Sequence, residues 1–201
     1  PLCFADLMLR AGEVDGSIAG AVYTTGDRVR SALQIVGVKP GFKSVSSFML
    51  MIFEAEHHDP QQTMLFADCA LIVGPDAAQL AEIALSTVQS AHQFLDAEAR
   101  VAMLSFSTDG SASHPLVDKV REATRIAREQ MPQTAIEGDV QLDAAIVPSV
   151  ARQRGDRHPP RRLRDFCRPR RARRRCAAHA RHPDAQRCLR RPGRQGPAHA
   201  S

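Results

Sequence analysis

Hydroxyl side chains are concentrated in one short stretch, Ser105–His114, which is a candidate ligand-binding site. The stretch holds four serines, one threonine and one glycine. Hydroxyls, together with the free backbone N–H groups at the start of a following helix, favour an anion such as phosphate. An ordinary capped turn is the alternative, because serine and aspartate are common helix caps. The candidate anion contacts are Ser105, Ser107, Thr108, Gly110 and Ser111.

A second candidate is Arg30, one turn inside a helix that the sequence predicts to begin after Tyr23. The run Thr24-Thr25-Gly26-Asp27 precedes it, and Asp27 is the candidate N-cap. An arginine beside an anion site can form fork-shaped hydrogen bonds to phosphate. The alternative is an arginine that is solvated at the surface.

Asp68 is a third candidate, because it ends a predicted buried strand. A carboxylate at such a place is costly unless it is paired or functional. Its alternative role is to cap the turn that follows the strand. Cys3 and Cys69 lie among apolar residues, and we expect both to be buried free thiols.

Metal-ligand residue types occur in two groups, but neither predicts a metal site. The first group contains adjacent histidines, which cannot both face the same way on a strand, so a solvated loop is favoured. Its members are Glu54, Glu56, His57, His58 and Asp59. The second group matches no common zinc spacing. Its members are Cys167, Cys176, His179, His182 and Cys188.

Helices and strands alternate around these candidates. Periodicity and cap residues predict helices over 2–10, 27–36, 77–95 and 114–130. Strands are predicted over 17–23, 44–53, 63–67 and 100–107, with another inside 136–146. Such alternation predicts an α/β domain whose sheet has helices on both faces. Ligands bind such sheets beyond the carboxyl ends of the strands, where the three candidates lie.

The two longest predicted helices each have a clear inward face. In the first, the inward residues are Leu80, Ile83, Ala84, Val88 and Ala91. In the second, they are Val117, Val120, Ala123, Thr124 and Ala127.

The charge of the chain changes sign after about residue 150. Residues 1–150 have a net charge of −9, whereas residues 151–201 contain 17 arginines, no lysine and a net charge of +14. We expect a globular domain over 1–150 and a disordered tail over 151–201, because the tail has too few large apolar residues to offset the entropy of ordering.

The arginine-rich tail has two interpretations. One is a nucleic-acid-binding extension of an acidic domain, which would bind with a steep salt dependence. The other is a coding sequence read out of frame. Codons for Arg164–Arg170, read from the second base, can spell Ala-Thr-Phe-Val-Val-Pro-Asp, a buried strand that runs into a turn.

The chain shows neither a cleavable signal pattern nor an apolar run long enough to span a bilayer. We therefore expect a cytoplasmic protein without membrane attachment. Because Pro1 lies inside an apparent helix, we also expect residues to be missing before it.

Several long motifs resemble the phosphate acetyltransferase (phosphotransacetylase) family, of the phosphate acetyl/butyryltransferase type. They cover nearly all of residues 1–150, in the order of the family. The resemblance lies in Arg10–Gly16, Ala19-Gly20-Ala21, Thr24–Asp27, Arg30–Gln34, Phe66–Ala70, Leu104–Thr108, Gly110–Ala112, His114–Val117 and Asp139–Ala145. Tyr23 stands where the family often has histidine.

The resemblance implies acetyl transfer between coenzyme A and inorganic phosphate, in the cleft of a two-domain fold like that of isocitrate and isopropylmalate dehydrogenases. It implies that Arg30, Thr24 and Thr25 meet phosphate or the coenzyme. Acetyl-CoA is a substrate, no resident cofactor is expected, and the intact protein is expected to be a homo-oligomer. The family's Phe-Pro-Asp strand and Asp-Leu-Ser-Arg-Gly segment have no counterpart in 151–201, so the catalytic residues are unassigned and we expect this chain to be inactive alone.

A second enzyme-related interpretation shares these motifs. Large malic enzymes carry an acetyltransferase-like C-terminal domain, which can act as a regulatory acyl-CoA binder. A malic-enzyme domain encoded before Pro1 would favour it over a phosphate acetyltransferase.

Overall fold

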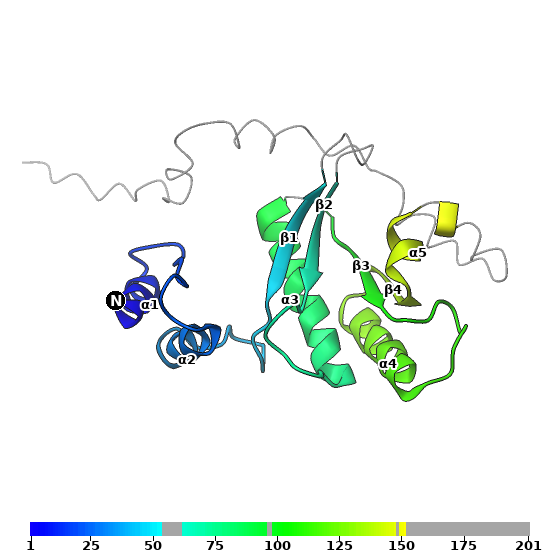
Figure 1. Ribbon diagram of the computed structural model, residues 1–201, viewed down its shortest axis with the longest axis horizontal. Helices are drawn as coiled ribbons and strands as arrows, with labels where there is room; N and C mark the ends of the chain where they lie inside the picture. Colours follow the sequence, from blue (N-terminus) through cyan, green and yellow to red (C-terminus); the bar gives the residue numbers. More distant parts are fainter. Residues whose placement is uncertain (54–61, 96–97, 148, 152–201) are drawn as a thin grey trace, which may run out of the picture. The chain divides into compact units, whose positions relative to one another are not determined.

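The computed structural model describes residues 1–53, 62–95, 98–147 and 149–151, drawn in colour in Figure 1. Residues 54–61, which contain the first group of metal-ligand residues and the loop predicted there, lie outside this part. Residues 152–201, which make up the predicted tail except for its first residue and contain the second group of metal-ligand residues, also lie outside it. Within the described part, residues 1–43 form one compact unit and residues 44–151 belong to another.

The first unit is a pair of helices, α1 (Leu2–Ala11) and α2 (Thr25–Ile35). The α1 helix ends at Gly12, which has φ 77° and whose N–H reaches the carbonyls of the last turn, a conformation that glycine adopts without steric cost. Two side chains connect the helices. The Ser31 hydroxyl donates to the buried carboxylate of Asp6, and Arg10 Nη1 donates to the Ile35 carbonyl at 2.8 Å.

The strand predicted over 17–23 is wrong. This segment has no strand, and Gly20 takes φ 138°. The guanidinium of Arg28 donates to the Ala19 carbonyl, so a side chain satisfies a backbone acceptor here. A strand needs a paired neighbour for its backbone groups, and within 1–43 no strand is available to pair with this one.

Over the described residues 44–147, the second unit has two small sheets and three helices (Figure 1). Strands β1 (Phe48–Phe53) and β2 (Gln62–Ala67) form an antiparallel pair, with Phe48 opposite Ala67. Strands β3 (Arg100–Leu104) and β4 (Ala135–Val140) form a parallel pair, with Val101 opposite Ile136. The helices are α3 (Ala77–Leu95), α4 (Pro115–Gln130) and the short α5 (Leu142–Ile146).

The core lies between α3, α4 and the β3–β4 pair. The inward face predicted for α4 is confirmed, since Val117, Val120, Ala123, Thr124 and Ala127 are all buried. On α3 the prediction is confirmed for Ile83, Ala84, Val88 and Ala91, whereas Ala81 replaces Leu80 among the buried residues. Helix α4 lies very close to β4, because a Cβ on Gly138 would come within 1.8 Å of Thr124 Oγ1. This position therefore requires glycine.

Several further expectations need correction. The strand predicted from 44 begins only at Phe48, and its residues Phe48–Ile52 are exposed rather than buried. Cys3 and Cys69 are also exposed: Cys3 lies in the first turn of α1, with its Sγ 3.8 Å from the Ser31 hydroxyl, and Cys69 lies in the turn after β2. The α/β class is confirmed, but the described strands form two sheets rather than one sheet covered on both faces.

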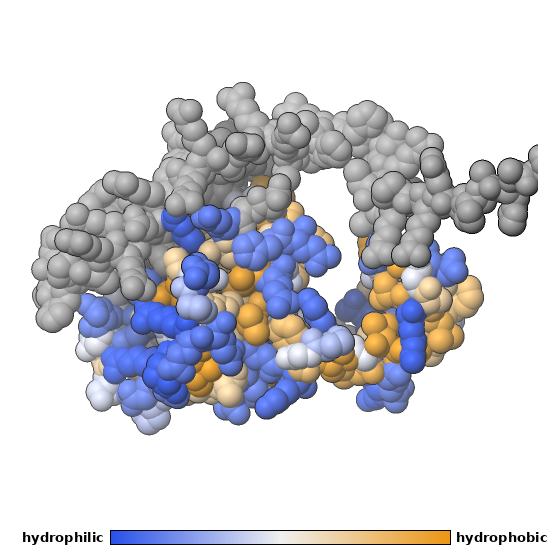
Figure 2. Space-filling model, turned by 180° about the vertical axis from the view of Figure 1, so that it is seen from behind, coloured by the Kyte–Doolittle hydropathy of each residue, from blue (hydrophilic) through white to orange (hydrophobic). Residues whose placement is uncertain are grey.

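Hydrophobic surface remains on the described residues. Phe4 and Leu7 of α1 are exposed, and the lobe of α1 and α2 shows much hydrophobic surface on the face drawn in Figure 2. Among the described helices, none is both long and apolar enough to cross a membrane.

Candidate functional site

The first turn of α2 is capped by Thr24. This residue is extended, and its Oγ1 accepts from the Asp27 N–H at 3.2 Å while donating to Asp27 Oδ2 at 2.7 Å. The prediction of Asp27 as the N-cap is therefore wrong. Asp27 lies three residues inside, where an acidic side chain complements the threonine cap and the positive end of the helix.

Arg30 lies on the next turn of α2 and projects into solvent. Its side chain is 71% exposed, and its Nη1 lies 3.5 Å from the exposed carboxylate of Asp27. Exposed pairs of this kind contribute only about 0–1 kcal/mol, so Asp27 is a weak competitor for an incoming anion. No hydrogen bond from the described residues reaches the amides of Thr25 and Gly26. The start of α2 thus combines two open N–H donors, the Arg30 guanidinium and the positive end of the helix dipole, which together suit a phosphate.

The loop between β3 and α4 uses its hydroxyl groups internally. Ser107 and Thr108 are buried, and the Ser107 hydroxyl accepts from the Ala112 N–H at 3.2 Å. The Ser111 hydroxyl lies 3.2 Å from that of Ser107 and accepts from the Thr108 N–H at 3.0 Å. Thr108 Oγ1 in turn exchanges hydrogen bonds with the amide group and backbone of Gln141. These contacts hold the loop in shape.

The surface of the loop is formed by other members of the predicted set. Gly110 and Ser111 are exposed, and Ser105 is half-buried. Contact of these five loop residues with phosphate stays a prediction, and for Ser107 and Thr108 it would require the loop to open.

Asp139 organises this loop, a role that its place in the motif Asp139–Ala145 did not predict. The residue is 4% exposed and has φ 55°. Its Oδ2 accepts from the Gly110 N–H at 3.0 Å and from Arg121 Nε and Nη2 at 3.1 and 2.8 Å. Its carbonyl accepts from the Asp109 N–H at 2.9 Å. Asp139 lies 18 residues from Arg121, and no short sequence motif connects such positions.

The two ionised groups stabilise one another. Burial alone would raise the pKa of Asp139, but hydrogen bonds from Gly110, Arg121 and Ser107 lower it more. The hydrogen bond to Asp139 likewise raises the pKa of Arg121. Asp139 is therefore an ionised structural group and a poor proton acceptor.

Asp68 has the capping role. Its carboxylate accepts from the Ser47 hydroxyl at 2.6 Å and from the backbone N–H groups of Ala70 and Leu71, both at 2.9 Å. Burial would raise its pKa, but these hydrogen bonds lower the pKa to about 2. The peptide bond before it, Ala67–Asp68, is cis. A carboxylate that accepts from three backbone N–H groups of its own turn, and from both the N–H and the hydroxyl of Ser47, is committed to structure.

The two candidate anion sites lie in different units, α2 in the first and the β3–α4 loop in the second. In the parts of the chain that the structure covers, no three histidine, cysteine, aspartate or glutamate residues are grouped as a metal site would require.

Comparison with known proteins identifies relatives over most of the chain. The family described as "Phosphate acetyl/butaryl transferase" matches residues 1–159. A phosphate acetyltransferase from Acetivibrio thermocellus is 46% identical over 154 residues, covering 77% of this chain and 46% of that protein. The chain thus spans about half the length of such relatives.

Solved structures agree with these matches. A phosphotransacetylase from Streptococcus pyogenes is 43% identical with a TM-score of 0.66, covering 75% of this chain and 44% of that chain. The EutD phosphotransacetylase from Staphylococcus aureus is 40% identical with a TM-score of 0.65, covering 76% of this chain and 45% of that chain.

Proposed function

Since the chain belongs to the phosphate acetyl/butaryl transferase family, we propose that it supplies phosphate- and coenzyme A-binding groups to an acyltransferase. The reaction exchanges an acetyl group between coenzyme A and inorganic phosphate. The observation that carries this proposal is that the first two turns of α2 present Arg30 and the amides of Thr25 and Gly26 to solvent.

The reaction requires two things of the site: it must bind phosphate, and it must deprotonate the coenzyme A thiol. Phosphate needs positive charge and N–H donors, which Arg30 and the start of α2 offer. The hydroxyls of Thr24 and Thr25 border the same turn, although Thr24 is occupied by the cap. The ligand is a phosphate group of acetyl phosphate, inorganic phosphate or coenzyme A, and it is a substrate rather than a resident cofactor.

Turnover also needs a base for the coenzyme A thiol. Asp68 and Asp139 have lowered pKa values, so both are weak bases, and both are committed to their loops. The proposal therefore assigns binding to this chain and leaves turnover to an intact protein. It places that protein in the cytoplasm, as a homo-oligomer whose two-domain fold resembles those of isocitrate and isopropylmalate dehydrogenases.

Calorimetric titration of the chain with coenzyme A and, separately, with acetyl phosphate tests the proposal. Arg30→Ala should weaken binding about ten- to a hundredfold, because a charge-assisted hydrogen bond is worth roughly 1.5–3 kcal/mol. Arg30→Lys should recover only part of the loss, since an ammonium lacks the planar fork. Arg125→Ala, which removes another exposed helical arginine, is the matched control. Equal affinities of the wild type and Arg30→Ala for both ligands would refute the proposal.

A further inference from the structure

The sequence contains two Asp-Gly pairs, Asp15-Gly16 and Asp109-Gly110, and serine follows each of them. Such a pair can isomerise. The glycine amide nitrogen attacks the carboxyl carbon of the aspartate side chain, so that a C–N bond forms, a C–O bond breaks and water leaves. The five-membered imide then takes up water at either carbonyl, which restores aspartate or gives isoaspartate, whose main chain runs through the side chain. Glycine favours the attack because it has no Cβ to restrict the backbone.

The amide of Gly110 is held by the protein. Its N–H donates to Asp139 Oδ2 at 3.0 Å, and the Asp109 N–H donates to the Asp139 carbonyl at 2.9 Å. Asp139 is buried, and Arg121 holds its carboxylate in place. An attack by the Gly110 nitrogen must therefore break a hydrogen bond to an ionised group. It must also build negative charge on the nitrogen beside a carboxylate, which is unfavourable.

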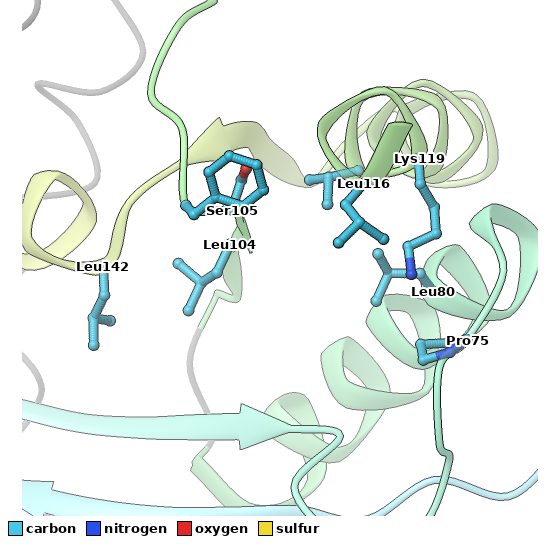
Figure 3. Close-up of a pocket in the computed structure, with 9 residues that line it drawn as sticks. Pro75, Leu80, Leu104, Ser105, Leu116, Lys119 and Leu142 are labelled. Atoms are coloured by element: carbon cyan, nitrogen blue, oxygen red, sulfur yellow. The ribbon is translucent and has the colours of Figure 1, made fainter. Parts of the chain in front are cut away.

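The loop that carries Asp109-Gly110 is also fixed at its start. Ser105 donates its N–H to the Val140 carbonyl at 2.9 Å. The same serine lines the pocket beside the end of β3, which is also lined by leucines of β3, α4 and α5 (Figure 3). The backbone of this loop therefore has little freedom to bring the Gly110 nitrogen to the carboxyl carbon of Asp109.

The amide of Gly16 is not held in this way. Asp15 and Gly16 lie between the end of α1 and the start of α2, in a segment with neither helix nor strand. The Gly16 N–H donates to none of the described residues. A Cβ built on Gly16 would meet nothing within 4 Å, so the space around this backbone is open. Asp15 itself has a polar or electrostatic contact, whereas the amide that would attack it has none.

We propose that Asp15 is a site of spontaneous isoaspartate formation in the native protein, and that Asp139 protects Asp109 from the same reaction. All four residues of the two pairs are exposed, so access of water does not distinguish the pairs, but the hydrogen bonding of the glycine amide does. Isoaspartate at residue 15 lengthens the main chain between α1 and α2 by one methylene group. The reaction needs only the chain and water, so it does not depend on acyl transfer.

Peptide mapping of the full chain, aged at neutral pH, tests the proposal. Trypsin places the two pairs in different peptides, residues 11–28 and 101–119. Electron-transfer fragmentation distinguishes isoaspartate from aspartate, because it cleaves the additional carbon–carbon bond of the isoaspartate main chain. Isoaspartate should accumulate severalfold faster at residue 15 than at residue 109. In urea the two rates should become similar, because the two pairs have the same neighbour and no fold to distinguish them.

The attacking amide is tested by Gly16→Ala. This substitution should slow isoaspartate formation at Asp15 severalfold, because a Cβ restricts the backbone beside the nitrogen. It should leave the fold intact, because the added methyl group meets no atom within 4 Å. Its rate at Asp109 should equal that of the wild type.

The protecting carboxylate is tested by Asp139→Ala. The rate at Asp109 should rise about tenfold, the lower end for the loss of a hydrogen bond to a charged group, and the rate at Asp15 should not change. Asp139→Asn keeps an acceptor and should give a smaller rise. Asp118→Ala, which removes the exposed partner of Arg121, is the matched control and should change neither rate. Circular dichroism establishes that each variant is folded, and the comparison of native and urea-treated wild type needs no variant.

Three results would overturn the proposal. The first is an equal rate at residues 15 and 109 in the native wild type. The second is an unchanged rate at residue 109 in folded Asp139→Ala or Asp139→Asn. The third is formation at residue 15 in urea but not in the native chain, which would show that the segment between α1 and α2 is held as firmly as the loop before α4.

Discussion

The start of α2 and the loop before α4 are similar in composition, since each combines hydroxyl residues, a glycine and an aspartate. At the start of α2, Arg30 is 71% exposed and the amides of Thr25 and Gly26 receive no hydrogen bond from the described residues. In the loop before α4, the Gly110 amide and the Ser107 and Thr108 hydroxyls are bound by the protein itself. Composition therefore indicates the capacity to bind an anion, and distant residues such as Asp139 decide whether that capacity is already used.

Gly138→Ala should have the largest effect on stability. A Cβ there would meet Thr124 Oγ1 at 1.8 Å, and it would separate β4, with Asp139, from α4. Overpacking typically costs 1–3 kcal/mol, and we expect about 3 kcal/mol here because several atoms of a buried side chain collide. Urea unfolding measures this loss. Gly26→Ala is the control, because its nearest neighbour lies at 3.9 Å, and it should change stability by less than about 1 kcal/mol.

Asp139→Ala should destabilise the protein by about 2 kcal/mol. It removes the acceptor of Arg121 and of the Gly110 amide. The loss is smaller than for a fully buried pair, because Arg121 is 42% exposed. Asp139→Asn should lose less, since asparagine tolerates a positive φ. Asp118→Ala, which removes the exposed partner of Arg121, is the control. If Asp139→Ala and Asp139→Asn both unfold at the same urea concentration as wild type, the Asp139 contacts do not hold the loop.

Asp68 should give the protein a stability that depends on acid pH. Its pKa is lowered from the ordinary value of 3.8 to about 2 in the folded state. The ionised carboxylate therefore stabilises the fold above pH 3.8, and this stabilisation is lost as the pH falls toward 2. We expect a contribution on the order of 1 kcal/mol, because solvent still reaches this turn.

Thermal unfolding of wild type and Asp68→Asn between pH 7 and pH 2 measures this contribution. The difference in Tm should be constant at neutral pH and should shrink below about pH 4. A difference that grows as the pH falls would contradict the assignment of Asp68 as an ionised cap.

Arg30→Ala should have the smallest effect on stability, within about 0.5 kcal/mol, because its ion pair with Asp27 is fully at the surface. Urea unfolding measures it, and a loss above 1 kcal/mol would assign Arg30 a structural role. Urea unfolding and calorimetric titration of Arg30→Ala together distinguish a residue that contacts the ligand from a residue that stabilises the fold.

Most of the helices were predictable because their signals are local. The faces of α3 and α4 follow from apolar spacing, and the end of α1 follows from Gly12. The failed strand over 17–23 shows the limit, since β-branched residues do not form a strand without a neighbour. The predicted burial of β1 was also wrong. An apolar run indicates that a strand can be buried, but it does not indicate which other element covers that strand among the described residues.

The candidate sites show the same limit. That α2 begins with a capped turn was predictable from neighbouring residues, but the capping residue is Thr24 and not Asp27. Ligand contact by Arg30 stays a prediction. Burial of Ser107 and Thr108 was not predictable, because Asp139 and Gln141 reach them from more than 30 positions away in sequence. Contacts between residues so far apart in sequence can be identified only from the folded structure.

We expect the open first turn of α2, and not the closed loop before α4, to be the primary anion site. This can be measured by titrating the isotope-labelled chain with inorganic phosphate and following each residue by NMR, with chloride as the ionic-strength control. We expect saturable shifts of the Thr25 and Gly26 amides that disappear in Arg30→Ala. Saturable shifts at Gly110 and Ser111 that persist in Arg30→Ala, with α2 unchanged, would contradict it.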